Sequence, residues 1–73
     1  MKGMQYTVVL EPADDGSTSV WVPDLPGCTS TGDSRDEALV NIAEAIRGHI
    51  EALREHGEPV PPPRSTATQV QAA

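Results

Sequence analysis

The sequence predicts a small α+β domain in which one helix packs on a three-stranded antiparallel sheet, in the order β-β-β-α with a candidate final strand. Three observations predict this class: two short segments of β-sheet character, a third short β-branched segment, and one long amphipathic segment behind a helix-capping motif. We expect residues 1–58 to form a single domain and residues 59–73 to form a proline-rich extended segment with a polar tail.

Residues 4–10 predict the first strand, because apolar side chains recur there with the period of two that a half-buried strand requires. Pro12 and the turn-forming residues after it, including Asp15 and Gly16, predict a loop that leads into an antiparallel hairpin. Every second side chain of this segment is expected to face the core, and these residues are Met4, Tyr6, Val8 and Leu10.

Residues 18–22 predict the second strand, which has to end near Pro23 because proline has no N–H to donate. If Val20 and Val22 face the core, Trp21 points to the other face, near Thr7 or Val9 of the neighbouring strand. Residues 28–31 form a short polar segment, rich in β-branched residues, that predicts a third strand. We expect the single cysteine, Cys28, to be a small buried core residue, since nothing basic beside it would activate a thiol.

Residues 35–56 predict the helix. Ser34 and Glu37 form a capping box, in which the Ser34 hydroxyl accepts from the N–H of Glu37 and the Glu37 carboxylate accepts from the N–H of Ser34. Gly57 fits the C-terminal stop. The apolar residues at helical spacing, which we expect on the sheet side, are Leu39, Ile42, Ala43, Ile46, Ile50 and Leu53.

The prolines at 59 and 61–63 predict an extended chain after the helix. Residues 66–70 are the candidate for a short final strand, although a small, polar tail of this kind is often disordered.

The composition of the chain limits the classes of function that it can have. The net charge of −6 and the scattered Lys and Arg argue against direct nucleic-acid binding and favour a basic partner. A single Cys excludes an intramolecular disulfide, and no apolar run reaches the length of a membrane span, so we expect a cytoplasmic protein. With 73 residues, one Trp, one Tyr and no Phe, the core is small, so self-association or a partner subunit is expected.

The sequence contains no set of residues that predicts an enzyme, a metal site or a cofactor. The two histidines lie seven positions apart on the predicted helix, and the glycines match no phosphate-binding motif. One enzymatic alternative is a weak Mg²⁺-dependent nuclease that uses Glu11, Asp15 and Asp24. The simpler interpretation is that acidic loop residues are solvated turn formers.

A protein-binding surface is the stronger prediction. Trp21 beside Val9 is a candidate contact site, because Trp is enriched where a few residues carry most of the binding energy. The equal alternative is that Trp21 lies partly over the edge of the core or folds under the proline-rich tail. An ordinary solvated face is the stronger interpretation of the acidic helix surface. The candidate partner-binding residues are Thr7, Val9, Trp21, Asp24, Glu37 and Glu44.

Taken together, the motifs resemble the HicB family of antitoxins over about residues 4–63. The combination is specific as a whole, although any one part alone would be weak. The segments that carry the resemblance are residues 6–12, Asp15-Gly16, Val20-Trp21-Val22-Pro23-Asp24-Leu25-Pro26-Gly27-Cys28, Gly32-Asp33-Ser34, residues 37–46 and Gly57-Glu58-Pro59-Val60-Pro61.

The resemblance implies a partial ribonuclease H-like fold, β-β-β-α-β, and a non-catalytic function. Members of that family bind and cover a small basic toxin, HicA, which is an mRNA-cleaving ribonuclease. Many members also carry a C-terminal DNA-binding domain that dimerises the protein. No such segment follows here, so we expect no direct DNA binding by this chain. The alternative function is a stand-alone homo-oligomer, a dimer or larger, without a toxin partner.

Overall fold

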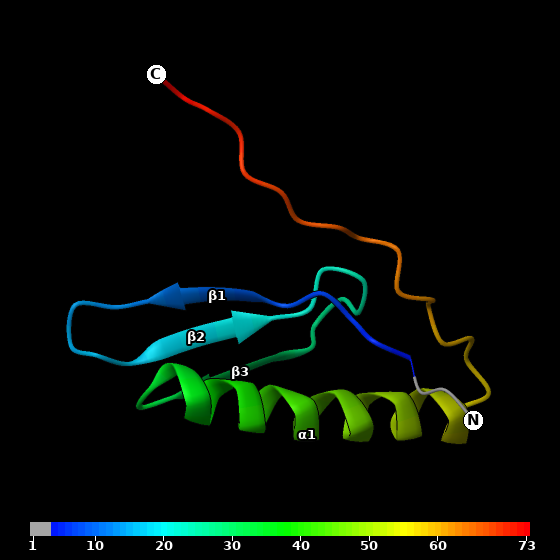
Figure 1. Cartoon of the computed structure of the whole chain (residues 1–73). Coiled ribbons are helices and arrows are strands. Elements are labelled where there is room, and N and C mark those ends of the chain that lie inside the picture. The colour runs from blue at the N-terminus through cyan, green and yellow to red at the C-terminus, as the bar shows by residue number, and fades with distance from the viewer. Residues whose placement is uncertain (1–3) are drawn as a thin grey trace.

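The computed structural model describes residues 4–73, and it consists of three strands and one helix (Figure 1). β1 (Val9–Pro12), β2 (Thr18–Trp21) and β3 (Thr29–Gly32) form an antiparallel sheet in that order. α1 (Arg35–Glu55) lies along one face of this sheet. The predicted α+β class and the order β-β-β-α are therefore confirmed. Residues 1–3, which the predicted domain includes, lie outside the described residues.

The first strand is shorter and later than the prediction of residues 4–10. β1 begins at Val9, whose Cα partner is Trp21, the last residue of β2. Residues before Val9 find no strand opposite them because β2 ends there and the chain turns at Pro23. Pro12 is the last residue of β1, opposite Thr18, and does not belong to the loop as predicted. Met4 is 46 % exposed, so its predicted place in the core is wrong.

The core lies between the sheet and α1. Val20 and Val22 are buried, as predicted, and Leu25 and Cys28 of the β2–β3 connection are buried with them. Burial raises the pKa of the Cys28 thiol, which fits a core residue that is protonated at neutral pH. The partly buried hydrophobic residues that surround this core are Tyr6, Val8, Leu10, Ala45 and Ile46.

The helix begins at its predicted residue and ends one residue before the predicted end. The Ser34 hydroxyl accepts a hydrogen bond of 3.2 Å from the N–H of Glu37. The reciprocal bond differs from the prediction, because the Glu37 carboxylate accepts from the N–H of Asp33, at 2.8 Å, and not from that of Ser34. Gly57 follows the helix with φ of +66°, a conformation that glycine adopts without strain.

The buried face of α1 is rotated relative to the predicted one. Ile42 is buried and Ile46 packs against the core, as predicted, but Ala38 is buried as well and Ala43 is exposed. The reason is Gly32 at the end of β3: a Cβ built there would lie 2.8 Å from the carbonyl carbon of Glu37 and 2.9 Å from the Cα of Ala38. Because glycine has no side chain, the first turn of α1 can approach the strand, and Ala38 becomes its contact residue.

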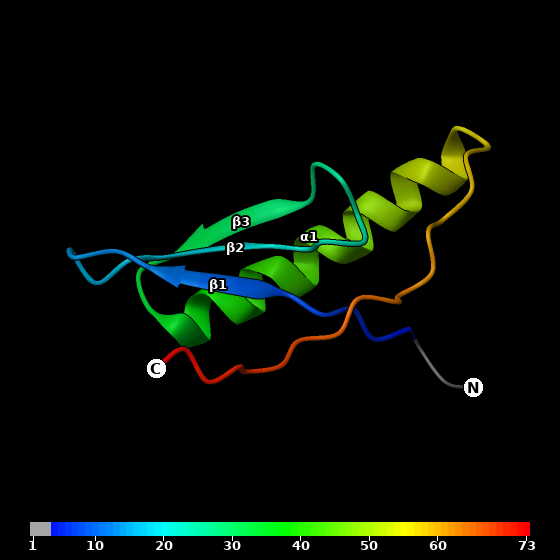
Figure 2. The same cartoon turned by 90° about the horizontal axis from the view of Figure 1, so that it is seen from above.

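The candidate final strand is absent. Residues 58–73 are extended but pair with no strand, and after residue 65 the chain runs beside β1 and rises away from the sheet (Figures 1 and 2). Val70 is 84 % exposed, so this segment buries too little apolar surface to hold it on the sheet edge. Within residues 4–73, no helix combines the length and apolar character that a membrane crossing requires.

Candidate functional site

The sheet has a face that points away from α1, and two apolar residues are cross-strand neighbours on it. Val9 of β1 and Trp21 of β2 are Cα partners in the antiparallel register. Because Val20 and Val22 are buried toward the helix, alternation along β2 directs Trp21 to the opposite face. Both Val9 and Trp21 are half-buried. We call this surface the open face, since no helix or strand among residues 4–73 covers it.

The open face is apolar at the end of the sheet where Val9 and Trp21 lie, and polar along the rest of the strands. Alternation places four further side chains of the three strands on this face, and all of them are exposed: Glu11, Ser19, Thr29 and Thr31. Partly buried apolar residues bordered by exposed polar ones are common in protein–protein interfaces.

A compact turn at the end of β2 borders the open face. Its backbone is closed by three hydrogen bonds, from the N–H of Val22 to the carbonyl of Cys28, from Leu25 to Val22 and from Cys28 to Leu25. Leu25 is fully buried and anchors the turn in the core. Gly27 has φ of +84°, which favours glycine at that position. This anchoring fixes the position of Asp24, which lies in the same turn.

The Asp24 carboxylate holds the segment that follows the helix. One oxygen accepts hydrogen bonds from the backbone N–H groups of Arg64 and Ser65, both at 2.8 Å, and the other accepts from the Ser65 hydroxyl at 2.7 Å. Hydrogen bonds from the Ser65 amide, the Arg64 amide and then the Ser65 hydroxyl hold the pKa of the Asp24 carboxyl below its usual value.

Two further hydrogen bonds hold the same segment, which we call the strap (residues 58–65). The Tyr6 hydroxyl donates to the carbonyl of Pro61 at 2.5 Å, and the Thr7 hydroxyl donates to the carbonyl of Ser65 at 2.8 Å. The strap therefore crosses the chain just before β1, and Figure 2 shows this crossing. It brings Thr7 and Asp24 together through Ser65, at the end of the sheet where Val9 and Trp21 lie.

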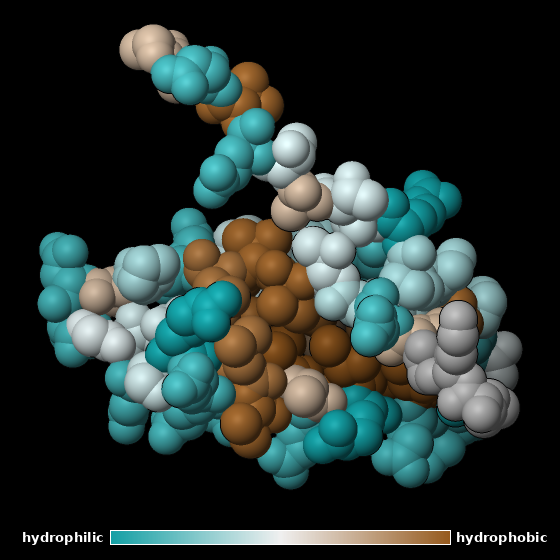
Figure 3. Space-filling view, in the orientation of Figure 1, coloured by the Kyte–Doolittle hydropathy of each residue, from teal (hydrophilic) through white to brown (hydrophobic). Residues whose placement is uncertain are grey.

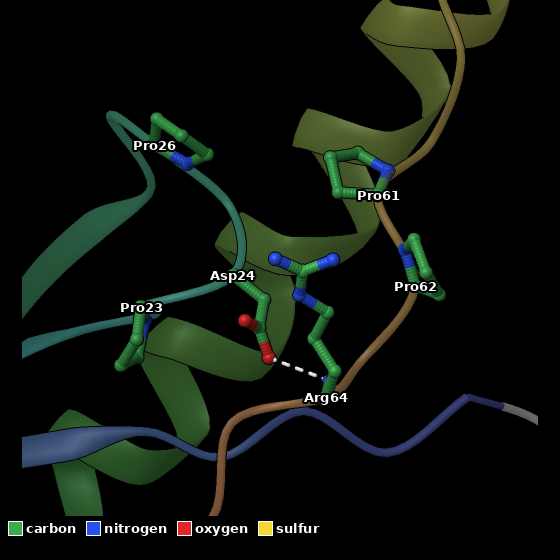
Figure 4. Close-up of a pocket in the computed structure, with 6 residues that line it drawn as sticks. All are labelled: Pro23, Asp24, Pro26, Pro61, Pro62 and Arg64. Atoms are coloured by element: carbon green, nitrogen blue, oxygen red, sulfur yellow. Dashed lines mark hydrogen bonds between the residues drawn. The ribbon is translucent and has the colours of Figure 1, made fainter.

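Between the strap and the β2–β3 turn lies a cavity of about 260 Å³, which we call the proline cavity. Figure 4 shows four proline rings and the side chains of Asp24 and Arg64 around it. The lining residues are Pro23, Asp24, Pro26, Pro61, Pro62 and Arg64. A second hollow, of about 390 Å³, lies along α1 beside Arg47, Ile50, Glu51 and Arg54.

The six predicted partner-binding residues fall into two groups. Thr7, Val9, Trp21 and Asp24 lie at one end of the sheet, joined by strand pairing and by the strap. Glu37 and Glu44 lie on α1, which packs on the other face of the sheet. Glu37 also accepts the capping hydrogen bond from Asp33. A single flat partner surface cannot contact both groups at once.

The acidic residues of the nuclease alternative do not converge. Asp15 lies in the loop before β2, where it accepts hydrogen bonds from the hydroxyl and N–H of Ser17, which lower the pKa of its carboxyl. Asp24 lies after β2, at the opposite end of that strand, and its carboxylate binds the strap. Among residues 4–73, no three His, Cys, Asp or Glu side chains are grouped so that they could hold a metal ion.

The sequence prediction missed the strap residues Pro61 and Ser65, which hold the tail against the sheet. No local pattern marks them, because their hydrogen-bond partners Tyr6 and Asp24 are 55 and 41 positions away. The one usable signal was the proline run itself, since a stiff extended segment after a helix can follow a sheet surface at a low entropic cost.

Comparisons with known proteins agree with this architecture. A family model described as a HicB-like antitoxin of bacterial toxin–antitoxin systems matches residues 6–73. A UPF0150 protein of Thermoplasma acidophilum is 50 % identical over 58 residues, which are 80 % of this chain and 84 % of that protein. The protein named Antitoxin HicB 1 of Photorhabdus laumondii is 38 % identical over 63 residues, which are 86 % of this chain and 41 % of that protein.

A solved structure has the same fold. The crystal structure of the N-terminal domain of Burkholderia pseudomallei antitoxin HicB superposes with a TM-score of 0.72 at 42 % sequence identity. The match covers 81 % of this chain and 69 % of that one. On the family match, the relatives and the shared fold, this chain belongs to the HicB-like antitoxin family of bacterial toxin–antitoxin systems.

Proposed function

We propose that this chain neutralises a small basic, mRNA-cleaving toxin of the HicA type by covering it with the open face. The observation that carries the proposal is the pair Val9 and Trp21, which lie side by side on a sheet face that no helix of residues 4–73 covers. Membership of an antitoxin family supplies the class of partner. Because the toxin cleaves mRNA, the proposed place of action is the cytoplasm.

The physical case rests on anchoring and on charge. Trp is enriched among the few residues that dominate interface energies, and here Trp21 lies on a paired strand with Val9 as its cross-strand neighbour. Glu11 on the same face and a net charge of −6 would attract a basic protein and speed its association. Thr7 and Asp24 are proposed as contacts through the strap, and Glu37 and Glu44 as a second surface on the helix.

The proposed mode of action is occlusion and not catalysis. Membership of an antitoxin family supports a non-enzymatic protein. Glu11, Asp15 and Asp24 are spread over the two ends of β2, so their geometry gives no support to the nuclease alternative.

Co-expression tests the proposal directly. The full chain is expressed with the product of any short basic reading frame found next to its gene, and growth and complex formation are measured. We expect the unmodified chain to restore growth, Trp21→Ala to fail, and Val40→Ala to succeed, because Val40 is 64 % exposed on α1, away from the open face. Equal protection by Trp21→Ala and the unmodified chain would contradict the use of this face.

A homo-oligomer is a second candidate, and one observation favours it. Within the described part of the chain, the outer edge of β1 pairs with no strand, and α1 packs mainly against β3 and β2. Figure 3 shows that a hydrophobic band stays visible between the sheet and the helix on this side. A second copy could pair with the edge and cover the band. Sedimentation tests this, and a monomer at all concentrations would exclude it.

A further inference from the structure

The proline cavity has the features of a binding site for one side chain of another protein. Its volume of about 260 Å³ lies just below the range of about 300–1,000 Å³ that is typical of small-molecule sites. The cavity is formed by two segments that are far apart in sequence, the β2–β3 turn and the strap, and the Asp24 hydrogen bonds hold these segments together. It is therefore built before any partner arrives.

The walls favour an aromatic group. Four of the six lining residues are prolines, whose rings are apolar and cannot change φ, so contact with them costs little conformational entropy. Figure 4 shows the Arg64 guanidinium pointing into the space between the turn and the strap. A guanidinium stacks on aromatic faces. The hydrogen bond from Arg64 to Asp24 is made by the backbone N–H of Arg64 and not by its guanidinium.

The charges favour a neutral occupant over an ion. Asp24 and Arg64 line the same cavity, so a free anion would meet the carboxylate and a free cation would meet the guanidinium. The Asp24 carboxylate accepts three hydrogen bonds and has about four lone-pair sites, which leaves room for one further donor. The hydroxyl of Tyr and the indole N–H of Trp are neutral donors of that kind.

We propose that the proline cavity receives a single aromatic side chain, Tyr or Trp, from a partner protein. The ring stacks on the proline rings and the Arg64 guanidinium, and its polar atom donates to Asp24. The cavity borders the end of β2 that carries Trp21, so such a partner can contact the open face and the cavity together. The proposal goes beyond toxin neutralisation and does not depend on it, because an aromatic amide should bind to the free chain.

The test is a titration of the full chain with small probe molecules. Binding is monitored through the backbone amide signals of Arg64, Ser65 and Gly27 in nuclear magnetic resonance spectra. The probes are N-acetyl-tryptophanamide and N-acetyl-tyrosinamide, with N-acetyl-leucinamide and acetate as comparisons. We expect saturable shifts from the aromatic amides, with Kd on the order of millimolar, as for one isolated group. We expect the leucine amide and acetate to cause no saturable change at these amides.

Variants separate the stacking from the shape of the cavity. Arg64→Met keeps the aliphatic stem and the backbone N–H, and it should weaken the aromatic amides about two- to fivefold. Arg54→Met, the matched change on α1, should leave their binding unchanged. Asp24→Asn should abolish binding by releasing the strap. Equal binding of the leucine amide, saturable binding of acetate, or no effect of Arg64→Met would overturn the proposal. Shifts of these amides with protein concentration alone would also overturn it, because the occupant would then be a second copy.

Discussion

Asp24 and Ser65 are joined by two hydrogen bonds, at 2.8 and 2.7 Å, although 41 positions separate them in the chain. One is accepted from the Ser65 backbone and the other from its hydroxyl, so a single carboxylate fixes both the position and the orientation of the strap. The proline cavity lies between the turn and the strap, the two segments that this contact joins.

Asp24→Asn should release the strap without unfolding the domain. The amide keeps the size of the carboxylate but has one acceptor oxygen in place of two, and it loses the charge that strengthens all three bonds. We expect the ¹⁵N heteronuclear NOE of Arg64 and Ser65 to fall toward that of a flexible tail, while the values of β2 and α1 stay unchanged. Asp14→Asn in the exposed hairpin loop is the control, and rigid Arg64 and Ser65 amides in the Asp24 variant would refute the role of this carboxylate.

The strap should also respond to pH. The pKa of the Asp24 carboxyl is lowered in the folded chain by its bonds to Ser65 and Arg64, below the usual value of about 3.9. The ionised Asp24 carboxylate therefore stabilises the strap above about pH 4, and this stabilisation is lost as the pH falls through the lowered pKa. The Ser65 amide signal, followed between neutral and strongly acidic pH, should move with a midpoint below that of an ordinary Asp. The same signal in Asp24→Asn should show no such step.

Much of the fold could be predicted because its signals are local. Ser34 and Gly57 define the ends of the helix within a few residues, and the turn at Pro23 ends the second strand. The start of β1 could not be predicted in this way, since a strand extends only as far as its partner and the partner ends at Trp21. The strap depends on a contact between two distant residues. The sequence singles out Asp24 as a candidate for partner binding, but no local pattern marks Ser65 as its hydrogen-bond partner.

The face of α1 that packs on the sheet is also set by a contact with another element, the one between Gly32 and the first turn of the helix. This contact leads to a prediction about two glycines. Gly32→Ala should destabilise the fold by about 1–3 kcal/mol, because the added methyl would overlap the backbone at Glu37 and Ala38. Gly48→Ala should stabilise it by about 0.5–1 kcal/mol, because Gly48 is an exposed position within α1 with nothing near the added Cβ. Urea unfolding of the two variants measures both effects. A neutral Gly32→Ala would mean that α1 can move away from β3 at no cost.

The choice between the two groups of partner-binding residues can be decided with one added charge on each side. Ser19 is exposed on the open face, and Val40 is exposed on α1, so Ser19→Lys and Val40→Lys each add one positive charge to the surface. The net charge changes equally, and long-range attraction of a basic toxin falls by the same amount in both variants. Only the variant whose lysine lies within the interface should also lose short-range affinity, by tenfold or more, and it should do so mainly through faster dissociation. We expect this for Ser19→Lys, measured by surface binding kinetics at low and high salt. The opposite result, a fast-dissociating Val40→Lys and an ordinary Ser19→Lys, would place the toxin on the helix that carries Glu37 and Glu44.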